Sequence, residues 1–89
     1  METKIKNAVL DIVKGRIERV NYEMCSKHII RSSSLAICES NNIHITDSLC
    51  YKDTITRNGI IIGEIRYRYA AHKRNGMYKM LAPIISYID

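Results

Sequence analysis

The last third of the chain has the pattern of two strands joined by a tight turn. From Ile60 onward the hydrophobic period is two, which is typical of a half-buried strand. Apolar or aromatic residues alternate with polar ones, as Ile65, Tyr67, Tyr69 and Ala71 do with Glu64, Arg66, Arg68 and His72. Asn75-Gly76 is a strong hairpin signal, because a type I′ turn needs positive φ at both central positions. The sequence therefore predicts a β-hairpin with one apolar face, one partly basic face and a cationic tip.

A two-residue turn at Asn75-Gly76 also fixes a register. The apolar residues then pair across the strands, with Tyr67 opposite Ile84, Tyr69 opposite Ala82 and Ala71 opposite Met80. Pro83 has no N–H donor, so we expect its strand to lie at the edge of a sheet.

The first segment has the period of an amphipathic helix. Its apolar residues recur at steps of three and four: Ile5, Ala8, Val9, Ile12, Val13, Ile17 and Val20. Thr3 is a suitable N-cap, while Gly15 weakens the middle of the predicted helix.

A short strand and a second helix are predicted next. The run 28–30 is apolar, and serines 32–34 are preferred N-cap residues for a helix over the patch 35–38. Asn41-Asn42 ends this helix, since Asn tolerates the left-handed conformation.

A third helix is predicted after a tight connection. Thr46 can cap it, the helix runs through Arg57, and Asn58-Gly59 is its stop signal. In this helix Ser48, Tyr51 and Ile55 share one face. The remaining face, with Asp47, Cys50 and Asp53 among its residues, is expected to point outward.

Length and composition favour one small domain over residues 1–89. The chain of 89 residues is 46% hydrophobic, too apolar for disorder, and its apolar runs are shorter than the roughly 20 residues of a membrane span. The amino terminus lacks a secretory hydrophobic region, so we expect a cytoplasmic protein.

No catalytic or metal-binding signature is found. Cys25, Cys38 and Cys50 have no metal-ligand spacing, so we interpret them as reduced and structural. The alternative is a redox switch, or a zinc site completed by His28 or His44. Because the sequence shows no phosphate loop, metalloprotease motif or nucleophile elbow, we expect neither an enzyme nor a cofactor.

The charge favours a polyanionic partner. The net charge is +5 and the pI is about 9.3. Cationic residues stand at the tip and on one face of the predicted hairpin, at positions suited to contact a phosphate backbone: Arg66, Arg68, Lys73, Arg74 and Lys79. The alternative reading of this tip is a solvated loop whose charges discourage edge pairing.

The order of predicted elements is that of an α+β winged helix-turn-helix, with three helices, a short first strand and a C-terminal β-hairpin wing. The run 37–43, the predicted helix 46–57 and residues 60–89 resemble small winged-helix enterobacterial regulators of the CaiF and GrlA kind. In that family the second helix carries a small, an acidic and a turn residue before Ile, here Cys38, Glu39, Asn42 and Ile43. The resemblance covers roughly residues 28–89 and implies a DNA-binding transcription regulator.

The resulting hypothesis places the third helix in the major groove of double-stranded DNA and the hairpin tip on the phosphates. The candidate DNA-binding residues are His44, Thr46, Asp47, Cys50, Arg57, Arg66, Arg68, His72, Lys73, Arg74 and Lys79. Pairing of first helices would give a homodimer, and no membrane partner is expected.

A protein-binding module is the alternative hypothesis. Asp47 and Asp53 on the outward face of the third helix would repel phosphates unless they contacted cytosine amino groups. The same α+β scaffold could instead serve a virulence effector, a phage-encoded inhibitor or an antagonist of a host regulator, without nucleic acid.

Overall fold

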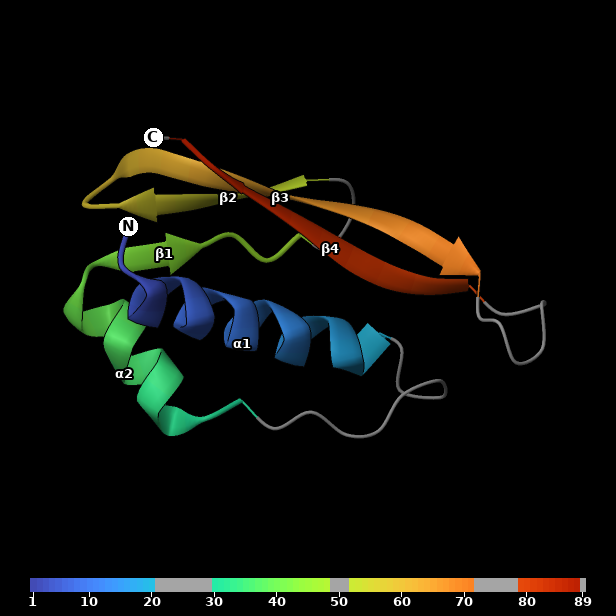
Figure 1. Cartoon of the computed structure of the whole chain (residues 1–89), viewed down its shortest axis with the longest axis horizontal. Helices are drawn as coiled ribbons and strands as arrows, with labels where there is room; N and C mark the ends of the chain where they lie inside the picture. Colours follow the sequence, from blue (N-terminus) through green and yellow to red (C-terminus); the bar gives the residue numbers. More distant parts are fainter. Residues whose placement is uncertain (21–29, 49–51, 72–78, 89) are drawn as a thin grey trace.

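Two helices pack on one face of an antiparallel sheet in the computed structural model (Figure 1). The structure describes residues 1–20, 30–48, 52–71 and 79–88, and of residues 19–20, 69–71 and 79–81 it describes only the backbone. Its elements are α1 (Thr3–Val20), α2 (Ser32–Ser40), β1 (Ile43–Ile45), β2 (Lys52–Arg57), β3 (Ile60–Ala71) and β4 (Lys79–Tyr87). Helix α1 lies along the sheet, and α2 packs beside α1 near β1 (Figure 1).

The sheet is a meander in the order β1-β2-β3-β4, with every neighbouring pair antiparallel. β3 pairs with β2 as far as Arg66 and with β4 from Gly63 to Ala71. The outer part of β3 and its partner in β4 therefore form a two-stranded ribbon that extends beyond β2 (Figure 1). We call residues 67–71 and 79–83 the ribbon.

The predicted first helix is confirmed. Its apolar stripe is buried as the sequence pattern requires: Ile5, Ala8, Val9, Ile12, Val13 and Ile17. From the sheet, Ile43, Ile45, Ile55 and Ile65 complete the core. Because the stripe is buried within the chain, these side chains are not available for the expected pairing of first helices in a homodimer.

The second helix is also confirmed, but its N-cap is Arg31, so the serines at 32–34 stand in its first turn and do not cap it. It ends at Ser40, and Asn42 adopts a left-handed φ of 55°. The backbone N–H of Asn41 donates hydrogen bonds to the carbonyls of Ile37 and Cys38. The polar Asn pair therefore stops the helix and turns the chain directly into β1.

The third helix, predicted from Thr46 to Arg57, is wrong. Residues Lys52–Arg57 form β2, in which Asp53 and Ile55 are buried and Lys52 is exposed. The helical spacing of Ser48 and Ile55 was coincidental. The β-branched run Thr54-Ile55-Thr56 favours a pleated strand, and pairing on both sides stabilises it there.

Asn58-Gly59 is a hairpin turn, so its interpretation as a helix stop is also wrong. Asn58 has φ of 53° and Gly59 of 80°, while Arg57 pairs with Ile60 across the turn. Positive φ at both central positions is the requirement of a type I′ turn. The same left-handed preference that ends helices here joins two strands.

The two C-terminal strands are confirmed, but their predicted register is off by one residue. Tyr67 lies opposite Pro83, and Ile84 lies opposite Arg66. Ile84 consequently faces outward, with 45% of its surface exposed. The predicted Asn75-Gly76 turn lies outside the described residues. Pro83 does lie on an edge strand, as expected.

The predicted winged helix-turn-helix is therefore incorrect. The described residues contain two helices followed by four strands, and no helix occupies the position expected for a recognition helix. Positions 28 and 29 of the predicted short strand lie outside the described residues, and Ile30 is not in a strand. None of the helices in the described ranges is long and apolar enough to cross a membrane.

Candidate functional site

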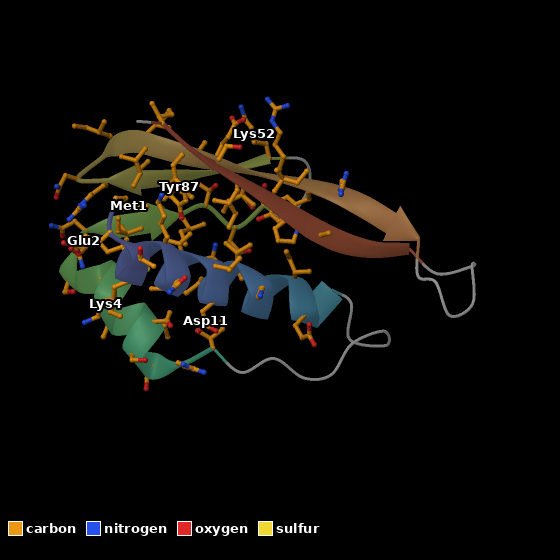
Figure 2. All side chains as sticks on the ribbon, viewed as in Figure 1. Met1, Glu2, Lys4, Asp11, Lys52 and Tyr87 are labelled. Atoms are coloured by element: carbon orange, nitrogen blue, oxygen red, sulfur yellow. The ribbon has the colours of Figure 1, made fainter. Side chains whose placement is uncertain are left out.

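The face of the sheet turned away from the helices is a polar surface. Burial alternates along the strands, so that Ile43 and Ile45 point to the core while His44 is exposed. The same alternation and the register bring together His44, Lys52, Thr54, Thr56, Ile61, Glu64, Arg66, Arg68, Ala82, Ile84 and Ser86. We call this surface the outer face. Lys52 projects from it, away from α1 (Figure 2).

Two cations of the outer face pair with one carboxylate. Glu64 pairs with Lys52 through an Nζ–Oε2 distance of 3.5 Å and with Arg66 through an Nε–Oε1 distance of 3.0 Å. Lys52 and Arg66 are directly opposite each other on β2 and β3. Glu64 orders these two cations. Together with Arg68, they make three positive charges against this one carboxylate, so a positive excess remains.

Arg68 lies on the ribbon, two residues beyond Arg66. It is exposed, and it has no ion-pair partner among the residues that the structure describes. Ala82 stands opposite Arg68 on β4. The ribbon therefore presents a guanidinium next to a small apolar neighbour, open to a partner.

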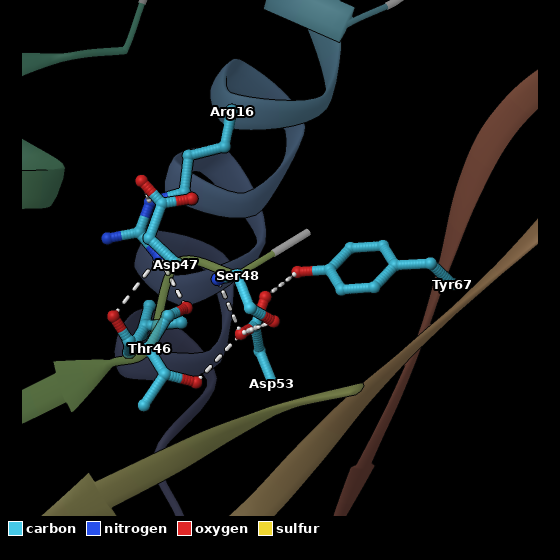
Figure 3. A network of polar contacts seen from close by, with 7 residues as sticks. Arg16, Thr46, Asp47, Ser48, Asp53 and Tyr67 are labelled. Atoms are coloured by element: carbon cyan, nitrogen blue, oxygen red, sulfur yellow. Dashed lines mark hydrogen bonds and ion pairs between the residues drawn. The ribbon is translucent and has the colours of Figure 1, made fainter. Parts of the chain in front are cut away.

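A second polar group lies on the inner side of the sheet, around Asp53 (Figure 3). Asp53 is only 1% exposed. Its Oδ1 accepts hydrogen bonds from the Thr46 hydroxyl at 2.9 Å and from the Ser48 N–H and hydroxyl at 2.8 and 2.7 Å. Tyr67 donates to Oδ2 at 2.7 Å. Four donors thus compensate the buried carboxylate.

These bonds determine the ionisation of both partners. Burial raises the pKa of Asp53, but the hydrogen bonds from Ser48, Tyr67 and Thr46 outweigh it and hold that pKa well below its usual range. The pKa of Tyr67 is raised above its usual value. Burial is the largest cause, and the hydrogen bond to Asp53 and the negative charge of Asp53 act in the same direction. A carboxylate so stabilised is a poor proton acceptor at neutral pH, so we assign the Asp53 cluster a structural role.

Arg16 connects helix α1 to the same segment. Its Nη1 donates to the carbonyls of Ile45 at 3.1 Å and Thr46 at 2.9 Å, and its Nε lies 3.8 Å from Asp47 Oδ2. Together, Arg16 and Asp53 hold the chain leaving β1 between the helix and the sheet (Figure 3). This fixes the start of β2, from which Lys52 reaches the outer face.

The predicted DNA-binding residues that the structure describes do not form one surface. His44, Arg66 and Arg68 share the outer face, whereas Thr46 and Asp47 belong to the segment held by Asp53 and Arg16. Arg57 is half-buried and donates to Asn41 Oδ1 at 3.0 Å, which ties the β2–β3 turn to the end of α2. Cys50, His72, Lys73, Arg74 and the side chain of Lys79 lie outside the described residues.

Sequence reasoning did not include Lys52 or Glu64 in the site and expected Asp53 to point outward. Reading Thr54-Ile55-Thr56 as a strand would have placed Lys52 and Asp53 on opposite faces, because successive side chains alternate. No local signal identifies Asp53 as buried, since its donors come from separate segments.

No protein-family model, curated protein or solved structure matches this chain.

Proposed function

We propose that this protein binds double-stranded DNA through the cationic part of its outer face. The observation that supports this function is that Lys52, Arg66 and Arg68 share one face of the sheet, where Glu64 pairs with Lys52 and Arg66 and a positive excess remains. This replaces the third helix of the sequence-based hypothesis with a sheet surface. The net charge of +5 adds a general attraction to a polyanion.

The shape of the ribbon supports the same function. A two-stranded β-ribbon is narrow enough to enter the major groove of B-DNA, which is about 12 Å wide. Arg66 and Arg68 point to the same face, and a rise of about 3.4 Å per residue separates them by about 7 Å. In the sequence β3 is followed directly by His72, Lys73 and Arg74, which extends the cationic series.

The expected binding is mainly electrostatic. Lysine and arginine contacts to phosphate release counterions, so affinity should fall steeply as salt rises. Because the described part of the outer face has no aromatic side chain for base stacking, we expect duplex DNA to bind better than single strands.

Fluorescence anisotropy with a labelled DNA duplex tests this function over a series of salt concentrations. Arg68→Gln should weaken binding and reduce the slope of log affinity against log salt by about 0.9, the loss of one phosphate contact. Lys14→Gln, on the helical side, removes the same charge and serves as the matched control. Absence of binding at low salt, or equal effects of the two variants, would refute the proposed function.

Protein binding is the second candidate, and apolar residues on the outer face favour it. Ile61 and Ile84 are 55% and 45% exposed, respectively. A shallow depression of about 370 Å³ is lined by Ile61, Ile88 and polar neighbours including Glu64 and Ser86. If this function is correct, Ile61→Ser should abolish capture of a stoichiometric protein partner, and Arg68→Gln should leave that capture intact.

A further inference from the structure

The guanidinium of Arg66 is held in place on the outer face, although 65% of its side chain is exposed. Its Nε donates a hydrogen bond of 3.0 Å to Oε1 of Glu64. Lys52 pairs with the other carboxylate oxygen, with 3.5 Å between Nζ and Oε2. Each oxygen of Glu64 therefore has a cation beside it, and the carboxylate anchors an arginine side chain that would otherwise sample many rotamers.

The bond to Glu64 leaves the outer end of the guanidinium available. An arginine has five N–H donors, one on Nε and four on the two Nη atoms. For Arg66, the hydrogen bond within the described part of the chain is made by Nε. The two Nη atoms form a planar pair of donors, which matches two acceptors that lie side by side. The major-groove edge of guanine offers such a pair in its O6 and N7 atoms.

Arg68 differs from Arg66 in this respect. It lies two residues further along β3, and it has no ion-pair partner in the ranges that the structure describes. A cation that no carboxylate orients is suited to a phosphate, because phosphate contacts fix the position of a protein on DNA and carry no sequence information. The outer face thus carries one positioned and one unrestrained arginine.

Ile84 adds an apolar group beside Arg66. It lies directly opposite Arg66 on β4, and it is 45% exposed. Residues in opposite positions have Cα atoms about 4.5–5.5 Å apart, and the bases of B-DNA follow one another every 3.4 Å or so along a strand. The two side chains can therefore contact neighbouring base pairs. The apolar group that a major groove presents is the methyl group of thymine.

We infer that Arg66 reads guanine in the major groove, with Glu64 as its positioning residue, and that Ile84 contacts the methyl group of a neighbouring thymine. The inference rests on the proposed DNA binding and adds a base preference to it. The preferred ligand is a DNA duplex in which guanine follows thymine. Lys52 and Arg68 contact phosphates and contribute to the affinity for every sequence.

Fluorescence anisotropy with two labelled duplexes tests the reading of guanine. The first duplex repeats the step TG along one strand, and in the second duplex 7-deazaguanine replaces every guanine. This base lacks the N7 acceptor but keeps the base pairing and the charge. We expect the wild type to bind the second duplex about tenfold more weakly, a loss within the range of one bidentate base contact.

Arg66→Lys separates base reading from charge attraction, because lysine keeps the charge but lacks the planar pair of donors. This variant should bind both duplexes equally, and its affinity should depend on salt as that of the wild type does. Arg68→Lys is the matched control and should keep the preference for guanine. Glu64→Ala removes a negative charge, so its affinity for DNA should not fall, while its preference for guanine should decrease.

A third duplex, with deoxyuridine in place of thymine, tests the contact of Ile84. The wild type should bind it about threefold more weakly than the first duplex, because one methyl group is no longer buried. Equal affinity for these two duplexes would overturn the role of Ile84.

The outcomes distinguish the inference from the function on which it rests. No binding of the wild type to any duplex at low salt would refute the proposed function and the inference with it. Binding without a preference between the first two duplexes would overturn the inference alone, as would an Arg66→Lys variant that keeps the preference. An unchanged preference in Glu64→Ala would overturn the positioning role of Glu64.

Discussion

The Tyr67 hydroxyl on β3 donates a hydrogen bond of 2.7 Å to Oδ2 of the buried Asp53 on β2. This bond reaches Asp53 from the neighbouring strand, whereas the described donors Thr46 and Ser48 belong to the segment between β1 and β2. Tyr67 therefore joins the base of the ribbon to the polar cluster that positions Lys52.

Tyr67→Phe should lower the free energy of unfolding by about 1.5–3 kcal/mol, since it removes a hydrogen bond to a charged, buried group. Tyr87→Phe is the matched control, because the Tyr87 hydroxyl is buried without a hydrogen-bond partner in the described residues. That second variant should be as stable as the wild type or more stable. Urea denaturation measures both, and equal losses would contradict the role assigned to Tyr67.

Asp53→Asn should make stability less dependent on pH in the acid range. The pKa of Asp53 in the folded protein lies below its value of about 3.9 in an unfolded chain. Its stabilising contribution is therefore complete above that value and is lost as pH falls toward the folded pKa.

Urea denaturation between neutral pH and about pH 3 should show the wild type losing stability more steeply than Asp53→Asn below about pH 5. Parallel curves for Asp53→Asn and the wild type would contradict the assignment.

Gly63→Ala should destabilise the pairing of β3 with β4. An added Cβ would lie 2.7 Å from the Ser86 carbonyl oxygen and 3.1 Å from a ring carbon of Tyr87. Because a backbone carbonyl cannot rotate away freely, we expect a loss of about 1–3 kcal/mol by urea denaturation. Ser86→Ala changes only an exposed side chain and should stay within about 0.5 kcal/mol of the wild type.

Cys38 should react slowly with iodoacetamide in the folded protein. It is 4% exposed, and burial raises the pKa of its thiol, an effect only partly opposed by the charge of Arg16. Peptide mapping by mass spectrometry should show slow labelling of Cys38 in buffer and rapid labelling in urea. Equally rapid labelling in both would contradict its place in the core.

The elements that the sequence predicted correctly are those whose local pattern and burial agree. The stripe from Ile5 to Ile17 requires one helical face, and α1 buries it. Asn41-Asn42 ended a helix as expected, whereas Asn58-Gly59 joined two strands. Asn42 and Asn58 share the left-handed φ, but the turn has a second positive φ at Gly59 and pairs Arg57 with Ile60 across it.

The candidate site was predicted only in part. The alternation of Arg66 and Arg68 with apolar residues placed these cations correctly on one face. Lys52 was missed because β2 had been interpreted as a helix. Asp53 was expected outside because it fell on the outward face of the predicted third helix. An isolated carboxylate is costly to bury, and the described hydrogen bonds that compensate Asp53 depend on contacts made only in the folded chain.

Pro83 has a consequence for how copies of this chain can meet. The Ile88 N–H donates to the Ile62 carbonyl on β3 at 2.8 Å. Because the N–H groups of successive residues point to opposite sides of a strand, the nitrogen of Pro83 faces the free side of β4. A strand from another molecule aligned along β4 would find no N–H donor at Pro83 and would lose one backbone hydrogen bond. Pro83 thereby protects β4 against recruitment into an intermolecular sheet and opposes fibril growth from that side.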